Sequence, residues 1–177
     1  ATLTLKAPEG AQPTDIAGIE AAGAAWWPLA LARQLDDAIL HLRTNELDIG
    51  TWLLKTRGDA QAVLAADALM LAHQDHWLVR ETIGALRRSF ARLDVSSRTL
   101  FALVDEGSCF AGLFAELAFA ADRTYMLALP DAPEKAPKMV LDEFSFGLLP
   151  MVNDQSRLQR RFYEETSAME AVRAAAG

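Results

Sequence analysis

Residues 99–126 read TLFALVDEGSCFAGLFAELAFAADRTYM and carry the clearest structural pattern in the chain. Residues 99–104 are apolar at nearly every position, which is typical of a parallel strand buried on both faces. A turn over 105–108 follows, then a helical run of small and apolar residues over 111–121 and a second strand over 124–129. The segment therefore predicts a strand–loop–helix–strand unit, from which parallel sheets are built.

The chain on the N-terminal side continues this alternation. Residues 2–6 alternate polar and apolar as a half-buried strand does, and residues 51–54 fit a short buried strand. Helices are predicted over 26–43, over 60–72 and from Asp75 onward, the last marked by apolar residues at steps of four and three (Val79, Ile83, Leu86, Phe90 and Leu93). The order predicts an α/β fold with a mostly parallel sheet flanked by helices.

The remaining segments are predicted from their Gly, Pro and helix-capping residues. Residues 7–23 are rich in Gly and Pro and predict an irregular lead-in to the first long helix. Asn153 is predicted to cap a helix that runs through Tyr163, and Ser167 to cap the last helix.

Composition excludes several classes of protein. The 177 residues are 51% hydrophobic and 23% charged, which is enough apolar material for one globular domain. The net charge of −7, with dispersed arginines, argues against a nucleic-acid partner. No apolar run approaches the roughly 20 residues that a membrane-spanning helix needs. A single cysteine, Cys109, and the lack of a recognisable signal peptide predict a cytoplasmic protein without an internal disulfide.

Simple catalytic motifs are missing from the sequence. It contains no GxGxxG, GxxxxGK[ST], GxSxG or HExxH pattern, which removes the usual basis for nucleotide-binding, serine-hydrolase and zincin assignments. His73 and His76 are three residues apart, but no third ligand stands at a suitable spacing, so we expect no metal site. Cys109 has no adjacent histidine, and we expect it to be a packed thiol.

The loop before the 111–121 helix could carry chemistry. A buried strand leads into a glycine-containing loop, and Glu116 follows near the start of the helix. Backbone N–H groups in such a loop can stabilise an oxyanion, and a carboxylate nearby can act as a general acid or base. The alternative is that Glu116 only complements the helix dipole. The residues alone leave both interpretations open.

These residues resemble the signature of the enoyl-CoA hydratase/isomerase (crotonase) superfamily. Residues 107–123 are similar to its oxyanion loop followed by Glu-Leu-Ala and an acidic residue, and residues 63–67 (VLAAD) to the upstream segment that supplies the first oxyanion donor. Residues 143–150 (EFSFGLLP) are similar to the segment that bears a second glutamate. The resemblance implies a crotonase (ClpP-like) fold over residues 1–177, with a mostly parallel sheet built from ββα-type units and flanking helices.

The resemblance also implies a set of site residues. In crotonases two backbone N–H groups hold a thioester carbonyl, and here Ala66 and a residue of the Gly112–Leu113 pair would be the donors. Glu116 and Glu143 would form the acid/base pair. No separate cofactor is implied because CoA is part of the substrate, and assembly into homo-oligomers is common in the superfamily.

Further segments narrow the resemblance to one branch of the superfamily, the ring-opening CoA-thioester lyases of aerobic benzoate degradation. The matching segments include WWPL (26–29), DDAIL (36–40), RTNEL (43–47), QSRL (155–158) and RFYEET (161–166). These lyases contain two crotonase-like regions in tandem, and this chain resembles the C-terminal one. The implied reaction opens the ring of an epoxidised (formally dihydrodiol) benzoyl-CoA and releases formate. The implied partner is the N-terminal crotonase-like domain of the same, longer polypeptide.

The chain departs from the superfamily pattern at the predicted oxyanion loop. Gly112-Leu113-Phe114-Ala115 stands where members have a run of glycines, and the large side chains of Leu113 and Phe114 would crowd a thioester. We therefore expect a degenerate crotonase unit that supports the pocket or the oligomer. The alternative is a structural or oligomerisation module that does not contact substrate. Leu113 and Phe114 side chains that fill the would-be pocket would favour this alternative.

Overall fold

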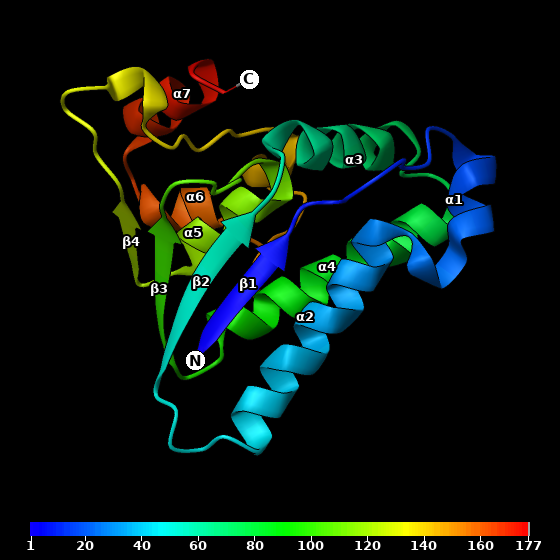
Figure 1. Ribbon diagram of the computed structural model, residues 1–177, viewed down its shortest axis with the longest axis horizontal. Coiled ribbons are helices and arrows are strands. Elements are labelled where there is room, and N and C mark those ends of the chain that lie inside the picture. The colour runs from blue at the N-terminus through cyan, green and yellow to red at the C-terminus, as the bar shows by residue number, and fades with distance from the viewer. Residues whose placement is uncertain (177) are drawn as a thin grey trace.

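Four parallel strands form one sheet in the order β1-β2-β3-β4, which follows the chain. The computed structural model describes residues 1–176. The strands are β1 (Thr2–Lys6), β2 (Thr51–Arg57), β3 (Thr99–Val104) and β4 (Arg123–Met126). All four strands point the same way, and their carboxyl ends lie at the end of the sheet on the side of α3 (Figure 1). The prediction of an α/β fold with a parallel sheet is confirmed.

Helices connect the strands. The α-helices are α1 (Ile16–Ala22), α2 (Trp27–Thr44), α3 (Ala60–Ala72), α4 (Trp77–Asp94), α5 (Ala115–Ala120), α6 (Arg157–Arg161) and α7 (Thr166–Ala174). Short 3₁₀ helices are η1 (Gly23–Ala25), η2 (Gly112–Phe114), η3 (Pro133–Lys135) and η4 (Glu143–Phe146). No helix within residues 1–176 is long and apolar enough to cross a membrane.

The core lies on one face of the sheet. Alternate strand positions are buried, among them Leu54 and Ala102, and they join one apolar cluster with residues of α2, α4 and α5. Positions between them, such as Phe101, are only half-buried, and Tyr125 beside it on β4 is 52% exposed. The prediction that residues 99–104 are buried on both faces is therefore wrong, because one face of β3 stays partly open.

Three predictions about helices also fail. The lead-in over 7–23 contains α1, whose N-terminus is capped by the Asp15 side chain accepting a hydrogen bond from Gly18 N–H. Helix α6 is capped by Ser156 and not by Asn153, through a reciprocal capping box with Gln159. The last helix begins at Thr166, so Ser167 lies inside it.

Candidate functional site

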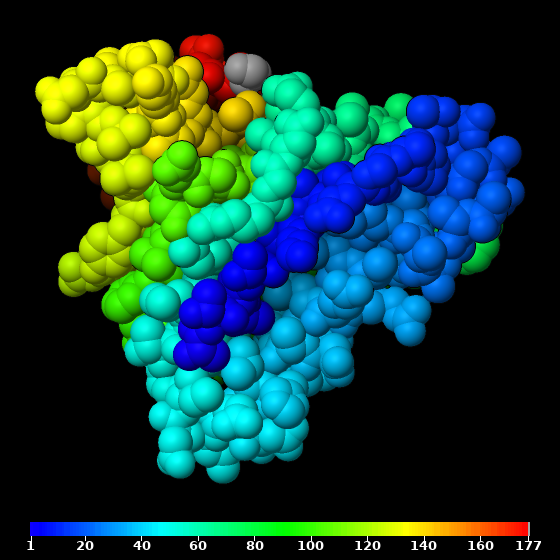
Figure 2. Space-filling model, viewed as in Figure 1, coloured from blue at the N-terminus to red at the C-terminus, as the bar shows by residue number. Residues whose placement is uncertain are grey.

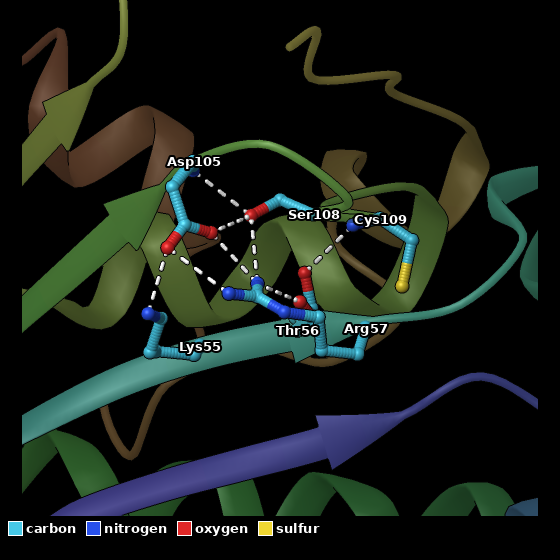
Figure 3. Close-up of polar contacts among 6 residues, drawn as sticks. All are labelled: Lys55, Thr56, Arg57, Asp105, Ser108 and Cys109. Atoms are coloured by element: carbon cyan, nitrogen blue, oxygen red, sulfur yellow. Dashed lines mark hydrogen bonds and ion pairs between the residues drawn. The ribbon is translucent and has the colours of Figure 1, made fainter.

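The loop that leads to the predicted site is fixed at the carboxyl ends of β2 and β3 (Figure 3). Arg57 makes two hydrogen bonds to the Asp105 carboxylate, of 2.7 and 3.0 Å, and Lys55 Nζ lies 2.7 Å from it. These contacts, with the Arg57 hydrogen bonds foremost, hold the pKa of Asp105 well below its ordinary value. Cys109 N–H donates to Thr56 Oγ1 on β2, and the Cys109 thiol is buried. The packed thiol predicted for Cys109 is therefore confirmed.

Gly112 and Leu113 begin η2 directly after this loop, and both of their N–H groups already have protein acceptors. Gly112 N–H donates to Val140 C=O at 2.9 Å. Leu113 N–H donates to Asp67 Oδ2 at 2.7 Å in a buried contact. A ligand carbonyl could use either donor only by displacing the present acceptor.

Asp67 approaches Gly112 so closely that only glycine fits there. Gly112 has φ +51°, and a Cβ on it would overlap Asp67 Oδ2 and lie 2.9 Å from Asp142 Oδ2. Two carboxylates thus converge on the backbone at the position where the superfamily pattern places an oxyanion.

Ala66 lies in the interior of α3, as its seventh residue. Only the first four N–H groups of a helix lack an intrahelical acceptor, so the Ala66 N–H is engaged by the helix in this structure. Its neighbour Asp67 is the residue that reaches Leu113. The assignment of Ala66, Gly112 and Leu113 as oxyanion donors stays a prediction, and it would require rearrangement of α3 and η2.

Glu116 lies in the first turn of α5 and is only 1% exposed. Its Oε2 accepts a hydrogen bond of 2.7 Å from Arg157, which also binds both carboxylate oxygens of Asp94 and the Leu149 carbonyl. Burial, only partly offset by Arg157, raises the pKa of Glu116 to about 7. The second oxygen, Oε1, has no hydrogen-bond partner among the described residues. Glu116 is thus a buried ion-pair partner of Arg157 whose pKa is suited to proton transfer.

Glu143 differs from Glu116 in its surroundings. It is exposed at the start of η4, and the preceding Asp142 caps this helix by accepting from Phe144 N–H at 2.9 Å. The role of Glu116 and Glu143 as an acid/base pair stays a prediction.

The side chains of Leu113 and Phe114 point into the core. Both are fully buried, and the Phe114 ring packs edge-on against Trp27 of α2 at 5.6 Å. They fill the volume next to the predicted oxyanion loop. Among the two expectations drawn from the sequence, this packing favours the one in which the loop does not receive a thioester.

Three residues of this site were not predicted from the sequence: Asp67, Asp142 and Arg157. Each lies within or beside a segment that the resemblance singled out, since Asp67 follows Ala66, Asp142 precedes Glu143 and Arg157 belongs to QSRL. Their contacts across the site join positions 30 to 63 residues apart in the chain. A local sequence pattern carries no signal for such pairings.

Other candidate sites lie away from these residues. Residues 1–176 contain no group of three His, Cys, Asp or Glu side chains able to hold a metal ion, and His76 faces Glu20 at 3.3 Å. A groove of about 840 Å³ runs between β1 and α2 and is lined by Leu5, Trp27 and Leu35 among others. Figure 2 shows β1 lying at the surface along this side of the molecule. None of the five predicted site residues lines the groove.

The fold and the site define an α/β domain with a parallel sheet and acidic side chains buried around the loop after β3. The chain is similar to benzoyl-CoA-dihydrodiol lyase from Aromatoleum evansii, with 55% identity over 176 residues. The match covers 99% of this chain and 31% of that enzyme, so the chain spans about a third of the length of this curated relative. No family model matches the chain. The resemblance to a lyase of this kind, inferred from the motifs, is therefore confirmed.

Proposed function

We propose that this chain is the C-terminal crotonase-like domain of a CoA-thioester lyase that opens the ring of an epoxidised or dihydrodiol benzoyl-CoA and releases formate. The identity of 55% to benzoyl-CoA-dihydrodiol lyase over 99% of the chain supports this assignment. The parallel sheet, with its glycine-containing loop and Glu116 helix after β3, is compatible with a crotonase fold. The partners we propose are the CoA-thioester substrate, an N-terminal crotonase-like domain of the same polypeptide and further copies in a cytoplasmic homo-oligomer.

Within that enzyme we assign this domain a supporting role. One observation carries the assignment: the Leu113 N–H, a predicted oxyanion donor, is bonded to the buried Asp67 carboxylate. Removing one oxyanion donor costs an enzyme about 3–4 kcal/mol of transition-state stabilisation, so a loop whose donor is already occupied is a poor catalyst. The pairing of Glu116 with Arg157 supports the same conclusion.

A purely structural module is the second candidate. The full burial of Leu113 and Phe114 favours it, because these side chains occupy the space a thioester would need. The two candidates differ in whether substrate touches this chain. Benzoyl-CoA bound in contact with residues of this chain in the full-length enzyme would favour the supporting role.

The test is ring opening by the full-length polypeptide that contains this chain. Wild type should convert epoxidised benzoyl-CoA with release of formate, and a lack of formate would contradict the lyase assignment. Glu116→Gln and Glu143→Gln, singly and together, should retain kcat within a few-fold of wild type, as should the control Glu81→Gln, which is exposed on α4. A loss of several hundredfold in a variant that still folds would place the chemistry in this domain.

A further inference from the structure

Asp67 and Asp142 form a contact between two acidic side chains with no cation attached. Asp67 is fully buried on α3, and Asp142 is half-buried at the N-terminus of η4. Both Oδ2 atoms lie no farther than 2.9 Å from the point where a Gly112 Cβ would stand, so the two carboxyl groups are close neighbours. No ion pair within residues 1–176 involves either carboxylate.

A hydrogen bond between two carboxyl groups requires a proton on one of them, since an ionised carboxylate can only accept. Each group also accepts one backbone hydrogen bond, Asp142 Oδ1 from Phe144 N–H and Asp67 Oδ2 from Leu113 N–H. Asp67 Oδ1 has no hydrogen-bond partner among the described residues. Burial and the neighbouring Asp142 raise the pKa of Asp67 well above its ordinary value. Asp67, the more deeply buried member, is the group that the surroundings keep protonated.

We infer that Asp67 and Asp142 share one proton and that this protonated pair is a pH-sensitive device that holds α3, η2 and η4 together over the Gly112–Leu113 backbone. While the proton is present, Asp67 accepts from Leu113 N–H and is hydrogen-bonded to Asp142, and the pair carries a single negative charge. When the proton leaves, two negative charges lie in contact in a buried site, and the contact becomes repulsive. The device goes beyond the proposed function, because it depends on these contacts and not on lyase activity.

The acidic groups around the pair also oppose the loss of its proton. Glu143 adds a negative charge beside Asp142. Glu116 of α5 also lies near Asp142, but it forms an ion pair with Arg157 of α6. Arg157 forms a second ion pair with Asp94 of α4. Arg157 thus serves Glu116 and Asp94, and no hydrogen bond within residues 1–176 connects it to Asp67 or Asp142.

Asp67→Asn tests the inference because an asparagine imitates the protonated acid. Its amide has an oxygen that can accept from Leu113 N–H, an NH₂ group that can donate, and no proton to lose. Thermal unfolding of the 177-residue chain should show wild type losing roughly 5 °C more in Tm than Asp67→Asn between pH 5 and pH 9. Asp142→Asn should reduce the loss similarly. Asp59→Asn is the matched control, because Asp59 caps the same helix without a carboxyl partner, and it should behave as wild type.

Equal losses of Tm in wild type and Asp67→Asn would overturn the inference. A second measurement keeps it testable if a variant does not fold. Carboxyl ¹³C titration of the wild-type chain should show one aspartate of the pair still protonated at pH 6, where ordinary aspartates are ionised. Full ionisation of both Asp67 and Asp142 at pH 6 would contradict the shared proton.

Discussion

Arg157 has a buried guanidinium group that connects three parts of the molecule. It binds Glu116 of α5, Asp94 of α4 and the Leu149 carbonyl, and its guanidinium lies 5.6 Å from the centre of the Phe90 ring. Two buried carboxylates therefore depend on one cation. A buried ion pair adds little net stability over a well-packed apolar group, but breaking it leaves unpaired charge in the core.

Arg157→Met should lower the free energy of unfolding by about 3–5 kcal/mol, because Glu116 and Asp94 would lose their counter-ion. Urea denaturation of the 177-residue chain measures the loss. The matched control is Arg87→Met, which breaks an ion pair of 2.6 Å to Asp154 whose members are 47% and 82% exposed. That change should cost less than about 1 kcal/mol. Equal costs for the two variants would contradict a structural role for the buried triad.

Glu116 gives stability a second pH dependence. Its pKa is raised by burial from 4.5 to about 7, so the native state holds a proton that the unfolded chain releases. Protonation of Glu116 therefore stabilises the native state fully below about pH 4.5, and this stabilisation is lost as pH rises through about 7. Glu116→Gln carries no proton to lose. Relative to wild type, it should gain roughly 3 kcal/mol of stability between pH 4 and pH 8. A constant difference in urea midpoints across that range would show that Glu116 titrates normally.

At the scale of elements, η2 is positioned by a close backbone approach. Gly112 has a positive φ and no room for a Cβ, whereas Gly107 has φ +76° and its Cβ would meet only Arg57 Cδ, at 3.9 Å. Gly107→Ala should cost about 1–2 kcal/mol, the cost of the backbone conformation alone. Gly112→Ala should cost at least about 2 kcal/mol more, because the Asp67 contact must also break. Similar urea midpoints for both variants would mean that α3 and η2 are not in contact through Asp67.

Sequence patterns predicted the long elements well and the short ones poorly. The prediction for α3 over residues 60–72 matches the structure, because alanine-rich sequence has strong helical propensity and Asp59 caps it. Helix α1 was missed because seven residues are too few to show periodicity among Gly18 and Pro13. The strand β3 was recognised, yet its apolar run did not reveal that Phe101 stays half-buried. An apolar residue in a strand predicts burial, but the sequence does not show whether another element covers that face of the sheet.

Across the whole molecule, the sequence motifs indicate the region of the site but not the side-chain contacts made there. The segments that contain Ala66, Gly112 and Glu143 do converge, through Asp67, Asp142 and the Gly112 backbone. What the sequence could not reveal is that the Asp67 and Asp142 side chains of this chain meet there. Such contacts depend on the relative placement of α3, η2 and η4, which no local pattern encodes.

The Leu113 N–H donates to Asp67 and is not offered to a thioester. The most direct measurement is a ¹⁵N NMR titration of the 177-residue chain with benzoyl-CoA, followed at the Leu113 amide. We expect the Leu113 resonance and its protection from hydrogen exchange to stay unchanged at saturating benzoyl-CoA. A saturable shift of that resonance, with loss of protection, would contradict it and make this loop a working oxyanion site.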